Sequence, residues 1–367
     1  MALLVLAVQL DDAWFVRHVA VPAQYLLAPR WLHPVVRAVP AAFGVLLMLL
    51  SGPISRASAG DLVRNGLAAL LACVPVEMLL RRDVNGATAW RGKKLELKIG
   101  RPDPRYGWVL LPSRTTALGA GGASPVPYAI DAWGGRAADD RGAPDPALPS
   151  LVVAGESIAV GHGLPFEQTF AALLAKRLGL QLVSVAAGGY GTDQALLRLE
   201  DTLPRLSRPV AMVMVVPLIQ LERNLQDYRP RLELADGALS LAPPAQGFLT
   251  GLRLRDVVVN ELPLLGEDKL RRAIAVTAAE LREAARVTRA HGAEPIFLAP
   301  MVGPRRPVDA HDEAQFLRPL FVEQGLPFVP IDLEPGELLP FDGHPGAAAS
   351  QRIATALADA LSQRLAR

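Results

Sequence analysis

Hydrophobic and polar positions alternate along the second part of the chain in a way that is typical of an α/β protein. Short apolar runs of the length of buried strands occur at 151–154, 182–186, 210–216, 295–299 and 327–331. Segments with the apolar spacing of helices lie between and after them, at 168–178, 193–206, 269–291, 313–324 and 346–365. This alternation predicts a parallel sheet with helices on both faces. In such sheets ligands bind at the carboxyl ends of the strands, so the loops after the strands are where chemistry is expected.

The N-terminal part of the chain has a different pattern, dominated by apolar residues. Two apolar stretches cover 38–54 and 66–80, and both are near the lower limit of the roughly 17–25 residues that a membrane-spanning helix needs. The first ten residues are apolar too, but they lack the basic start and the cleavage site of a signal peptide. We expect residues 1–82 to form hydrophobic, membrane-associated helices. A buried helical hairpin of a soluble protein is the alternative.

A segment rich in Gly, Pro and Arg separates these two parts. The runs 103–108 and 128–131 look like short strands bounded by turn residues. The sequence therefore predicts three parts: membrane-associated helices at 1–82, a small β-rich accessory segment at 83–149, and an α/β domain at 150–367.

Composition and charge narrow the range of functions. The 38 basic and 36 acidic residues give a net charge of +2 and a pI of about 8.8, with no block of like charges, so no nucleic-acid partner is expected. The single cysteine, Cys73, cannot form an internal disulfide, and no cysteine pair suggests a metal site. We expect neither a metal nor an organic cofactor.

Ser157 is the first residue with a possible chemical role, because it directly follows the apolar run 151–154. A serine hydroxyl becomes a good nucleophile when a base takes its proton. At a strand-to-helix junction, backbone N–H groups can point at a developing oxyanion, and Gly155 permits the close backbone approach that such a turn requires. The commoner role of a serine at this place is a helix cap, so the short motif needs support from elsewhere.

Three segments, in order along the chain, resemble sequence blocks of the SGNH/GDSL hydrolases. The first is GESIAVGHG at 155–163, with Glu156 where the commoner form has Asp. The second is AAGGYGTDQ at 186–194, and the third is FDGHP at 341–345, followed by an alanine-rich helix. A nucleotide-binding glycine loop does not fit the second block, because neither the G-x-G-x-x-G spacing nor a Walker lysine is present.

The resemblance implies a three-layer α/β/α fold, flavodoxin-like, that hydrolyses or transfers acyl esters. It implies that Ser157 is the nucleophile, that His344 is the general base, and that Asp342 orients the imidazole and stabilises the cation. The backbone N–H groups of Ser157 and Gly189 would form the oxyanion hole. No cofactor is implied.

The sequence departs from the family pattern in two places. Asp342 and His344 have Asp-x-His spacing instead of the Asp-x-x-His of many relatives, a feature shared with SGNH-like proteins that acetylate exopolysaccharides. After the third predicted strand, Ile219 stands where the family has an oxyanion-hole Asn. The adjacent Gln220 could substitute, whereas Asn224 lies too far along. Loss of one such donor costs about 100- to 1000-fold in rate in other enzymes.

Three functions remain open at this point. The first is a membrane-anchored ester hydrolase that acts on an ester-bearing small molecule or glycan. The second is an O-acyltransferase that acts on envelope or exopolysaccharide glycans, and the third is a catalytically weak domain that binds a glycan or a partner protein. The resemblance favours anchoring in a bacterial inner membrane with the catalytic domain outside the cytoplasm. Arginines and lysines on both sides of the apolar stretches nearly balance, so charge alone does not orient the chain.

Some residues with possible chemistry have an ordinary explanation. Trp108 and Trp133 either line a binding surface or, as is more usual for aromatic residues, fill a small core. His162 lies between two glycines, which is typical of a solvated loop residue, although it could touch a substrate. His291 ends a predicted helix, where an imidazolium is favoured by the helix dipole. The leucine-containing loop 225–265 is expected to cover the site.

Overall fold

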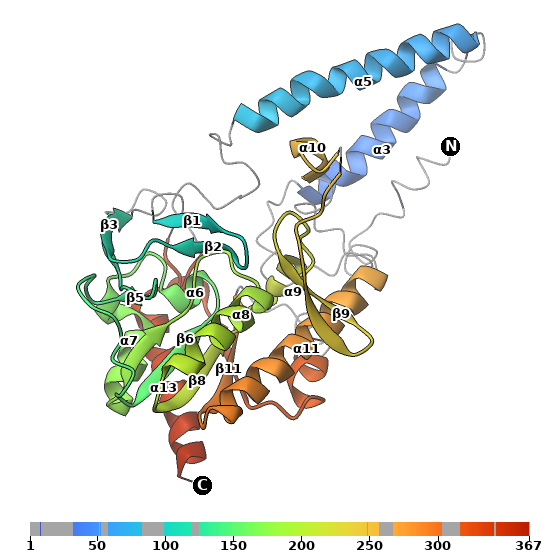
Figure 1. Ribbon diagram of the computed structural model, residues 1–367. Helices are drawn as coiled ribbons and strands as arrows, with labels where there is room; N and C mark the ends of the chain where they lie inside the picture. The colour runs from blue at the N-terminus through green and yellow to red at the C-terminus, as the bar shows by residue number, and fades with distance from the viewer. Residues whose placement is uncertain are drawn as a thin grey trace. The chain divides into compact units, whose positions relative to one another are not determined.

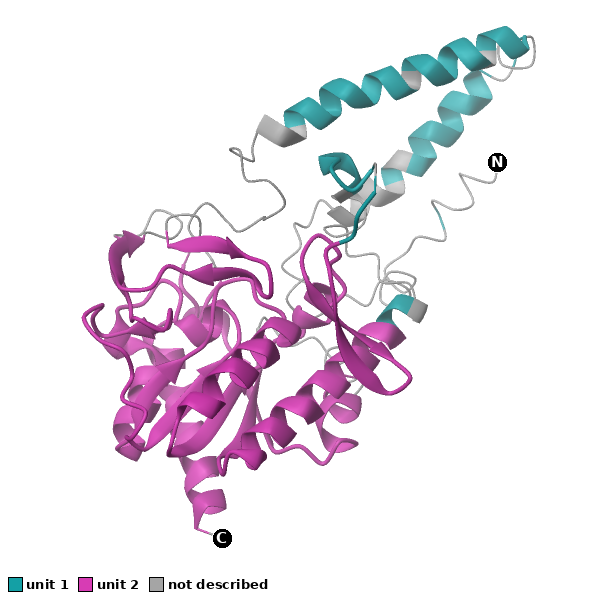
Figure 2. Cartoon of the chain, in the orientation of Figure 1, with its two compact units in different colours: residues 1–91, 245–270 teal, residues 92–244, 271–367 magenta. Residues whose placement is uncertain are grey.

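The computed structural model describes residues 8, 32–50, 52, 58–82, 99–118, 125–247, 249–256, 267–302, 316–340 and 343–366. The chain divides into two compact units, which are teal and magenta in Figure 2. Unit 1 comprises residues 1–91 and 245–270, and unit 2 comprises residues 92–244 and 271–367. The apolar N-terminal stretches therefore belong to unit 1, and the α/β pattern belongs to unit 2.

Unit 2 is built on a five-stranded parallel sheet (Figure 1). Its strands are β6 (Ser150–Ala154), β7 (Gln181–Ser184), β8 (Pro209–Val215), β11 (Glu294–Val302) and β12 (Phe328–Leu333). They lie in the order β12-β11-β8-β6-β7, and every neighbouring pair is parallel. The five predicted strands are thus confirmed. Because β7 pairs outside β6 and the chain then returns to β8, the connections change direction between β6 and β8, which is where sheets of this topology bind ligands.

Helices cover both faces of this sheet (Figure 1). On one face α7 (Phe170–Leu178) packs against α13 (Ala347–Leu365), and the other face carries α8 (Thr192–Thr202) and α11 (Glu267–Ala290). All five residues of β6 are buried between the two layers, as expected for a central parallel strand. The three-layer α/β/α fold predicted from the sequence is confirmed.

One predicted helix has a different form. The described part of the expected helix at 313–324 contains a single π-helical turn, Arg318–Val322. Pro319 stands at its start, and a proline has no N–H for the regular helical hydrogen bond. The turn then ends within a few residues at Gly325, whose φ is +62°, a backbone conformation that glycine adopts without strain.

The accessory segment contains two small antiparallel sheets. Their strands are β1 (Gly100–Asp103) with β2 (Gly107–Leu110), and β3 (Arg114–Leu118) with β4 (Val126–Ile130) and β5 (Arg136–Ala137). The run 103–108, expected as a single strand, instead contains the end of β1, the turn at 104–106 and the start of β2. The Asp103 carboxylate accepts the N–H groups of Arg105 at 2.9 Å and Tyr106 at 3.0 Å, and such an Asp-stabilised turn reverses the chain.

Unit 1 contains α3 (Leu32–Leu49), α5 (Ala59–Arg82) and the short α10 (Arg253–Asp256). The Glu77 carboxylate of α5 accepts the backbone N–H groups of Arg253 and Leu254, each at 2.7 Å. This carboxylate satisfies two donors at the start of α10 that have no partner within the helix. It therefore ties α10 to α5.

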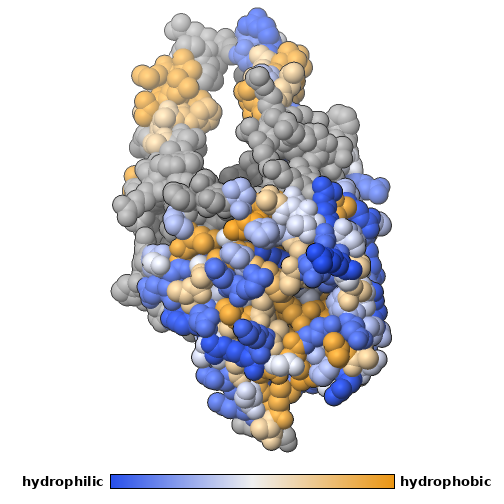
Figure 3. Space-filling view, turned by 90° about the vertical axis from the view of Figure 1, so that its left-hand side faces the viewer, coloured by the Kyte–Doolittle hydropathy of each residue, from blue (hydrophilic) through white to orange (hydrophobic). Residues whose placement is uncertain are grey.

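The surface of α5 is apolar and exposed. Its segment Ala59–Leu79 is long and apolar enough to cross a membrane, and none of it is buried. Leu70 and Leu71 are each 69% exposed, and large orange patches mark the coloured helices of unit 1 in Figure 3. A contiguous apolar surface of this kind marks a membrane or protein contact. The exposed surface of α5 does not fit the alternative considered for this part of the chain, a buried helical hairpin.

Candidate active site

The turn that carries Ser157 follows β6 directly. Gly155 has a φ of +133°, and a Cβ atom there would lie 3.0 Å from the carbonyl oxygen of Val215 on β8, so the close approach needs glycine. Ser157 is the first residue of α6 (Ser157–Val160), whose N-cap is Glu156. The Glu156 Oε1 atom accepts the N–H of Ile158 at 3.0 Å. Glu156 therefore takes the capping role that was the alternative for Ser157.

The structure brings Ser157 and His344 together. The Oγ atom of Ser157 lies 2.7 Å from the Nε2 atom of His344, although the two residues come from opposite ends of the α/β domain. The His344 segment is held by its own backbone, since the His344 carbonyl accepts the N–H of Leu339 at 2.7 Å. This is the arrangement of a nucleophile and its base. The third predicted member, Asp342, lies outside the described residues, and its role stays a prediction.

Glu156 also contacts the predicted nucleophile, Ser157. Its Oε2 atom accepts a hydrogen bond from the Ser157 hydroxyl. The side chain of Glu156 is only 3% exposed, and the guanidinium of Arg223 lies 3.7 Å from the same oxygen. The sequence indicated Glu156 only as a substitute for Asp and gave no sign of this contact.

The loop after β7 lies beside the Ser157 turn. The N–H of Ala187 donates to the carbonyl of Gly155 at 3.2 Å, and Gly189 has a φ of +78°. Among the residues that the structure describes, the N–H groups of Ser157 and Gly189 have no hydrogen-bond acceptor. Two unpaired N–H groups on adjacent loops, next to a nucleophile, are suited to bind an oxyanion.

Trp108 supports this loop from the accessory segment. Its side chain is 3% exposed, its indole N–H donates to the carbonyl of Gly188 at 3.1 Å, and its own carbonyl accepts the Tyr190 hydroxyl at 2.6 Å. Trp108 therefore fills a core and does not line a binding surface. Trp133 is half-buried, with the guanidinium of Arg205 3.6 Å from its ring centroid.

Gln220 is the predicted oxyanion-hole residue with the least geometric support. It begins α9 (Gln220–Arg223) and is 1% exposed. Its Nε2 atom donates to the carbonyl of Val215 at 3.2 Å, and its Oε1 atom has no partner within the described parts of the chain. The side chain is thus engaged with the end of β8. Its role at the oxyanion stays a prediction.

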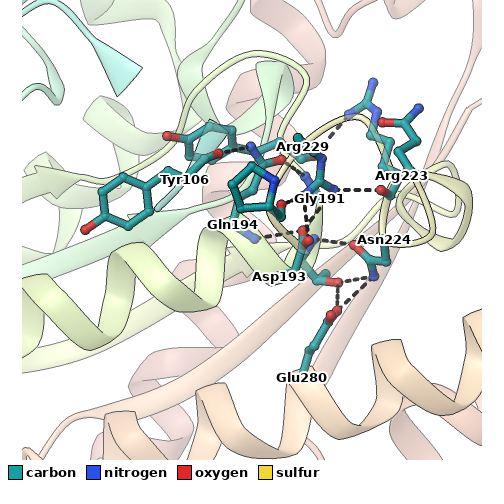
Figure 4. A network of polar contacts seen from close by, with 12 residues as sticks. Tyr106, Gly191, Asp193, Gln194, Arg223, Asn224, Arg229 and Glu280 are labelled. Atoms are coloured by element: carbon teal, nitrogen blue, oxygen red, sulfur yellow. Dashed lines mark hydrogen bonds and ion pairs between the residues drawn. The ribbon is translucent and has the colours of Figure 1, made fainter. Parts of the chain in front are cut away.

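A buried polar network lies at the start of α8, next to the loop that contains Gly188 and Gly189 (Figure 4). Asn224 accepts the N–H of Thr192 at 3.0 Å and donates to Glu280 of α11 at 2.9 Å. Thr192 donates to the same Glu280 oxygen at 2.5 Å. Burial raises the pKa of Glu280 well above its usual value, and the charge of Asp193 adds to this shift. Asn224 thus supports α8, the helix that follows the Gly189 loop, and its side chain is engaged within this network.

An ion pair completes this network (Figure 4). The guanidinium of Arg229 contacts both carboxylate oxygens of Asp193, at 2.5 and 3.1 Å, and both side chains are at most 2% exposed. Burial disfavours the charge of Arg229, but the Asp193 carboxylate outweighs this effect and raises the pKa of the guanidinium. Breaking such a pair costs about 3–5 kcal/mol, because the remaining charge stays buried. The network therefore fixes the segment that follows Gly189.

His162 lies beside His344, a position that fits the less favoured of its two sequence-based interpretations. Its ring contacts the ring of His344, with 4.5 Å between the centroids. It is half-buried and so differs from the solvated loop residue that was expected. In the described part of the chain, no cluster of three or more His, Cys, Asp or Glu side chains is arranged to hold a metal ion.

No protein-family model matches the chain, and no curated protein sequence matches it significantly. Solved structures do resemble it. An acetyl xylan esterase from the rumen bacterium Butyrivibrio proteoclasticus has 14% identity and a TM-score of 0.34, over 62% of this chain and 66% of that one. A carbohydrate esterase family 2 enzyme from Corynascus thermopiles (Myceliophthora fergusii) has 19% identity and a TM-score of 0.38, over 61% and 69%.

A third solved structure, a carbohydrate acetylesterase family member from Sinorhizobium meliloti, has 13% identity and a TM-score of 0.34, over 60% of this chain and 100% of that one. All three TM-scores are below 0.5 and all three identities are below 20%. At this level of similarity, the chemistry of the site decides the function.

Proposed function

We propose that the protein is a serine-dependent ester hydrolase of the SGNH/GDSL type, with Ser157 as nucleophile and His344 as general base. One observation carries the proposal: the 2.7 Å contact between Ser157 Oγ and His344 Nε2. It occurs at the carboxyl end of β6, beside the point where the sheet connections change direction. It also argues against the third function considered, a binding domain without catalysis, because a binding domain does not need this contact.

The reaction follows from the positions of these groups. The Ser157 oxygen attacks the ester carbonyl carbon while its proton passes to Nε2 of His344. The negative charge that develops on the carbonyl oxygen is stabilised by the N–H groups of Ser157 and Gly189. The carbon–oxygen bond to the alcohol then breaks, and His344 returns the proton to the departing alcohol. A water molecule, activated by the same imidazole, releases the acid and regenerates Ser157.

Asp342 completes this proposal as the partner of His344. It stands two residues before His344, and a carboxylate bound to Nδ1 would hold the imidazole in the correct tautomer. Replacement of the corresponding carboxylate by an amide in a serine protease lowers kcat by about 10⁴. Asp342→Asn is therefore expected to lower kcat strongly without unfolding the chain.

The substrate class that we propose is a short acyl ester, including esters on glycans. Hydrolysis of p-nitrophenyl acetate by the purified full chain is the direct assay. Ser157→Ala should remove the activity. The control is Ser240→Ala, which removes an exposed hydroxyl on β10 (Ala238–Ala242) and should leave the rate unchanged. Activity that survives in Ser157→Ala would refute the proposed nucleophile.

Acyl transfer to a sugar hydroxyl is the second function that a specific feature favours, namely the Asp-x-His spacing of Asp342 and His344. Both reactions share the acyl-enzyme, so they differ only in what accepts the acyl group. Adding an oligosaccharide to the ester assay separates them. Free acid as the main product supports hydrolysis, whereas acylated sugar formed in excess of free acid supports transfer.

We also propose that the chain is anchored in a bacterial inner membrane through its N-terminal part, with unit 2 outside the cytoplasm. The exposed apolar segment Ala59–Leu79 supports the anchor. The side of the membrane follows only from the family resemblance. Alkaline phosphatase fused after Arg367 tests it, because this reporter is active outside the cytoplasm and inactive inside.

A further inference from the structure

The ring of His162 packs on the proposed general base. The centroids of the His162 and His344 rings are 4.5 Å apart, and their planes meet at 42°, which is a close, tilted aromatic contact. The N–H of His162 also donates to the carbonyl of Ser157 at 3.0 Å. His162 thus contacts both the nucleophile and the base, although its side chain takes no step in the reaction described above.

A ring in this position can determine where the base points. The terminal torsion of a histidine side chain has only broad, shallow preferences, so neighbouring groups decide the plane of the ring. Proton transfer requires the His344 Nε2 atom to stay within hydrogen-bond distance of Ser157 Oγ. A second ring packed on His344 restricts its rotation and keeps Nε2 directed at the hydroxyl.

The backbone turn at 161–163 fixes the position of His162. Gly161 and Gly163, on either side of it, have φ values of +73° and +75°, which glycine adopts without strain. A Cβ atom at Gly161 would lie 2.2 Å from the side chain of Thr169. The N–H of Gly163 donates to the Tyr128 hydroxyl at 2.8 Å. The turn therefore has little room to move.

Arg136 of the accessory strand β5 holds the same turn. It is 3% exposed and donates to the carbonyls of Val160 at 2.9 Å, Gly161 at 2.5 Å and Leu164. Its guanidinium lies 3.7 Å from the centroid of the Tyr128 ring. Burying a guanidinium is costly unless it is hydrogen-bonded. These three carbonyls take the Nη donors, whereas Nε has no acceptor among the described residues, so the carbonyls and the two Nη groups hold one another in place.

We propose that His162 is a positioning residue for His344, and that Tyr128 and Arg136 of the accessory strands act on the reaction through it. The inference rests on the proposed function of Ser157 and His344. It gives the accessory strands β4 and β5 a role in catalysis, namely to hold the turn that orients the general base.

The first test compares His162→Ala, His162→Phe and wild type in the p-nitrophenyl acetate assay, with His291→Ala at the end of α11 as the matched control. His162→Ala should lower kcat about tenfold and change KM less than about twofold, because orientation is lost while substrate contacts remain. His162→Phe keeps the packed ring without its nitrogens and should restore most of kcat. A wild-type kcat in His162→Ala, or equal losses in both variants, would overturn the inference.

The second test is a double-mutant cycle with Tyr128→Phe, which removes the hydroxyl that binds Gly163 and keeps the ring beside Arg136. Tyr128→Phe alone should lower kcat several-fold. If it acts through His162, adding it to His162→Ala should cause no further loss. Additive losses would contradict the proposal that Tyr128 acts through His162. An inactive wild type would instead remove the proposed function and this inference together, whereas an active wild type beside an unaffected His162→Ala removes only the inference.

Discussion

Glu156 accepts a hydrogen bond from the hydroxyl of the residue that follows it, Ser157. The same hydroxyl lies 2.7 Å from Nε2 of His344. A hydroxyl has a single hydrogen to donate, so the carboxylate and the imidazole compete for it. While the Ser157 hydroxyl donates its hydrogen to Glu156, it cannot donate that hydrogen to His344. The buried carboxylate therefore opposes the first step of the proposed reaction.

Shortening this side chain should relieve the competition. Glu156→Asp keeps a carboxylate that caps α6, because aspartate is among the best N-cap residues, but its reach to the Ser157 hydroxyl is one methylene shorter. We predict that kcat/KM rises about fivefold, the equivalent of one hydrogen bond of ~1 kcal/mol. Steady-state kinetics and a melting curve check this. A fall in kcat/KM at an unchanged melting temperature would mean that Glu156 assists the reaction.

The indole of Trp108 should affect catalysis at a distance. Trp108→Phe keeps an aromatic ring in the core but removes the N–H that donates to Gly188 at 3.1 Å, next to Gly189, the proposed oxyanion-hole residue. We predict a loss of about 1 kcal/mol in the free energy of unfolding and a fall in kcat of roughly 3- to 10-fold with KM nearly constant.

Trp133→Phe is the control for this change, since among the described residues the Trp133 ring contacts Arg205 and not the loop after β7. It should leave kcat unchanged. The role of Trp108 would be refuted if both tryptophan variants had the same kcat as wild type, measured at substrate saturation.

The buried carboxyl of Glu280 should make stability depend on pH. Burial raises its pKa in the folded chain well above the usual 4.5, so the folded state retains a proton that the unfolded state releases. The contribution of this retained proton to the free energy of unfolding is fully present below about pH 4.5, and it is lost as the pH rises through the folded-state pKa. Glu280→Gln cannot titrate. We therefore predict that its free energy of unfolding falls less than that of wild type between pH 5 and pH 8.

Urea unfolding of both chains at several pH values measures this difference. The free energy of unfolding of Glu280→Gln should increase relative to that of wild type as the pH increases. A constant difference between the two across the pH range would mean that Glu280 is ionised in the folded protein.

The exposed face of α5 should hold the protein in membranes. Charges at Leu70 and Leu71, each 69% exposed, would lie inside the span Ala59–Leu79, where an arginine costs about 2.5–3.5 kcal/mol on insertion scales. We predict that the full chain remains in carbonate-washed membranes and that Leu70→Arg combined with Leu71→Arg releases much of it. Leu148→Arg, at an exposed leucine of unit 2, should not. Wild-type protein in the soluble fraction would contradict the anchor.

The apolar pattern predicted the sheet well for a physical reason. Strands that are buried on both faces are continuous apolar runs, so β6, β8 and β11 are visible in the sequence as such. Turns that depend on one side chain are less visible. Asp103 interrupts a run that looked like a strand, because its carboxylate binds two N–H groups of the next residues.

Contacts between distant residues explain what the sequence could not predict at the site. Arg229 and Asp193 look like ordinary surface charges until the fold buries them together. The ring contact of His162 depends on where the segment of His344 returns to the sheet. The burial of Glu280 did have a sign in the sequence. It lies seven residues after Ala273, three after Thr277 and four before Ala284, and these three residues are buried. That spacing places Glu280 on the buried face of its helix.

The reactivity of Ser157 toward a fluorophosphonate tests the central claim most directly. This reagent forms a covalent bond with a serine oxygen only when a base activates it. Intact-mass and peptide analysis should find one phosphonyl group on Ser157 in the wild type, none in Ser157→Ala, and labelling in His344→Ala slowed by roughly 100-fold or more. Wild-type protein that stays unlabelled, or a His344→Ala variant that labels as fast as wild type, would contradict the account.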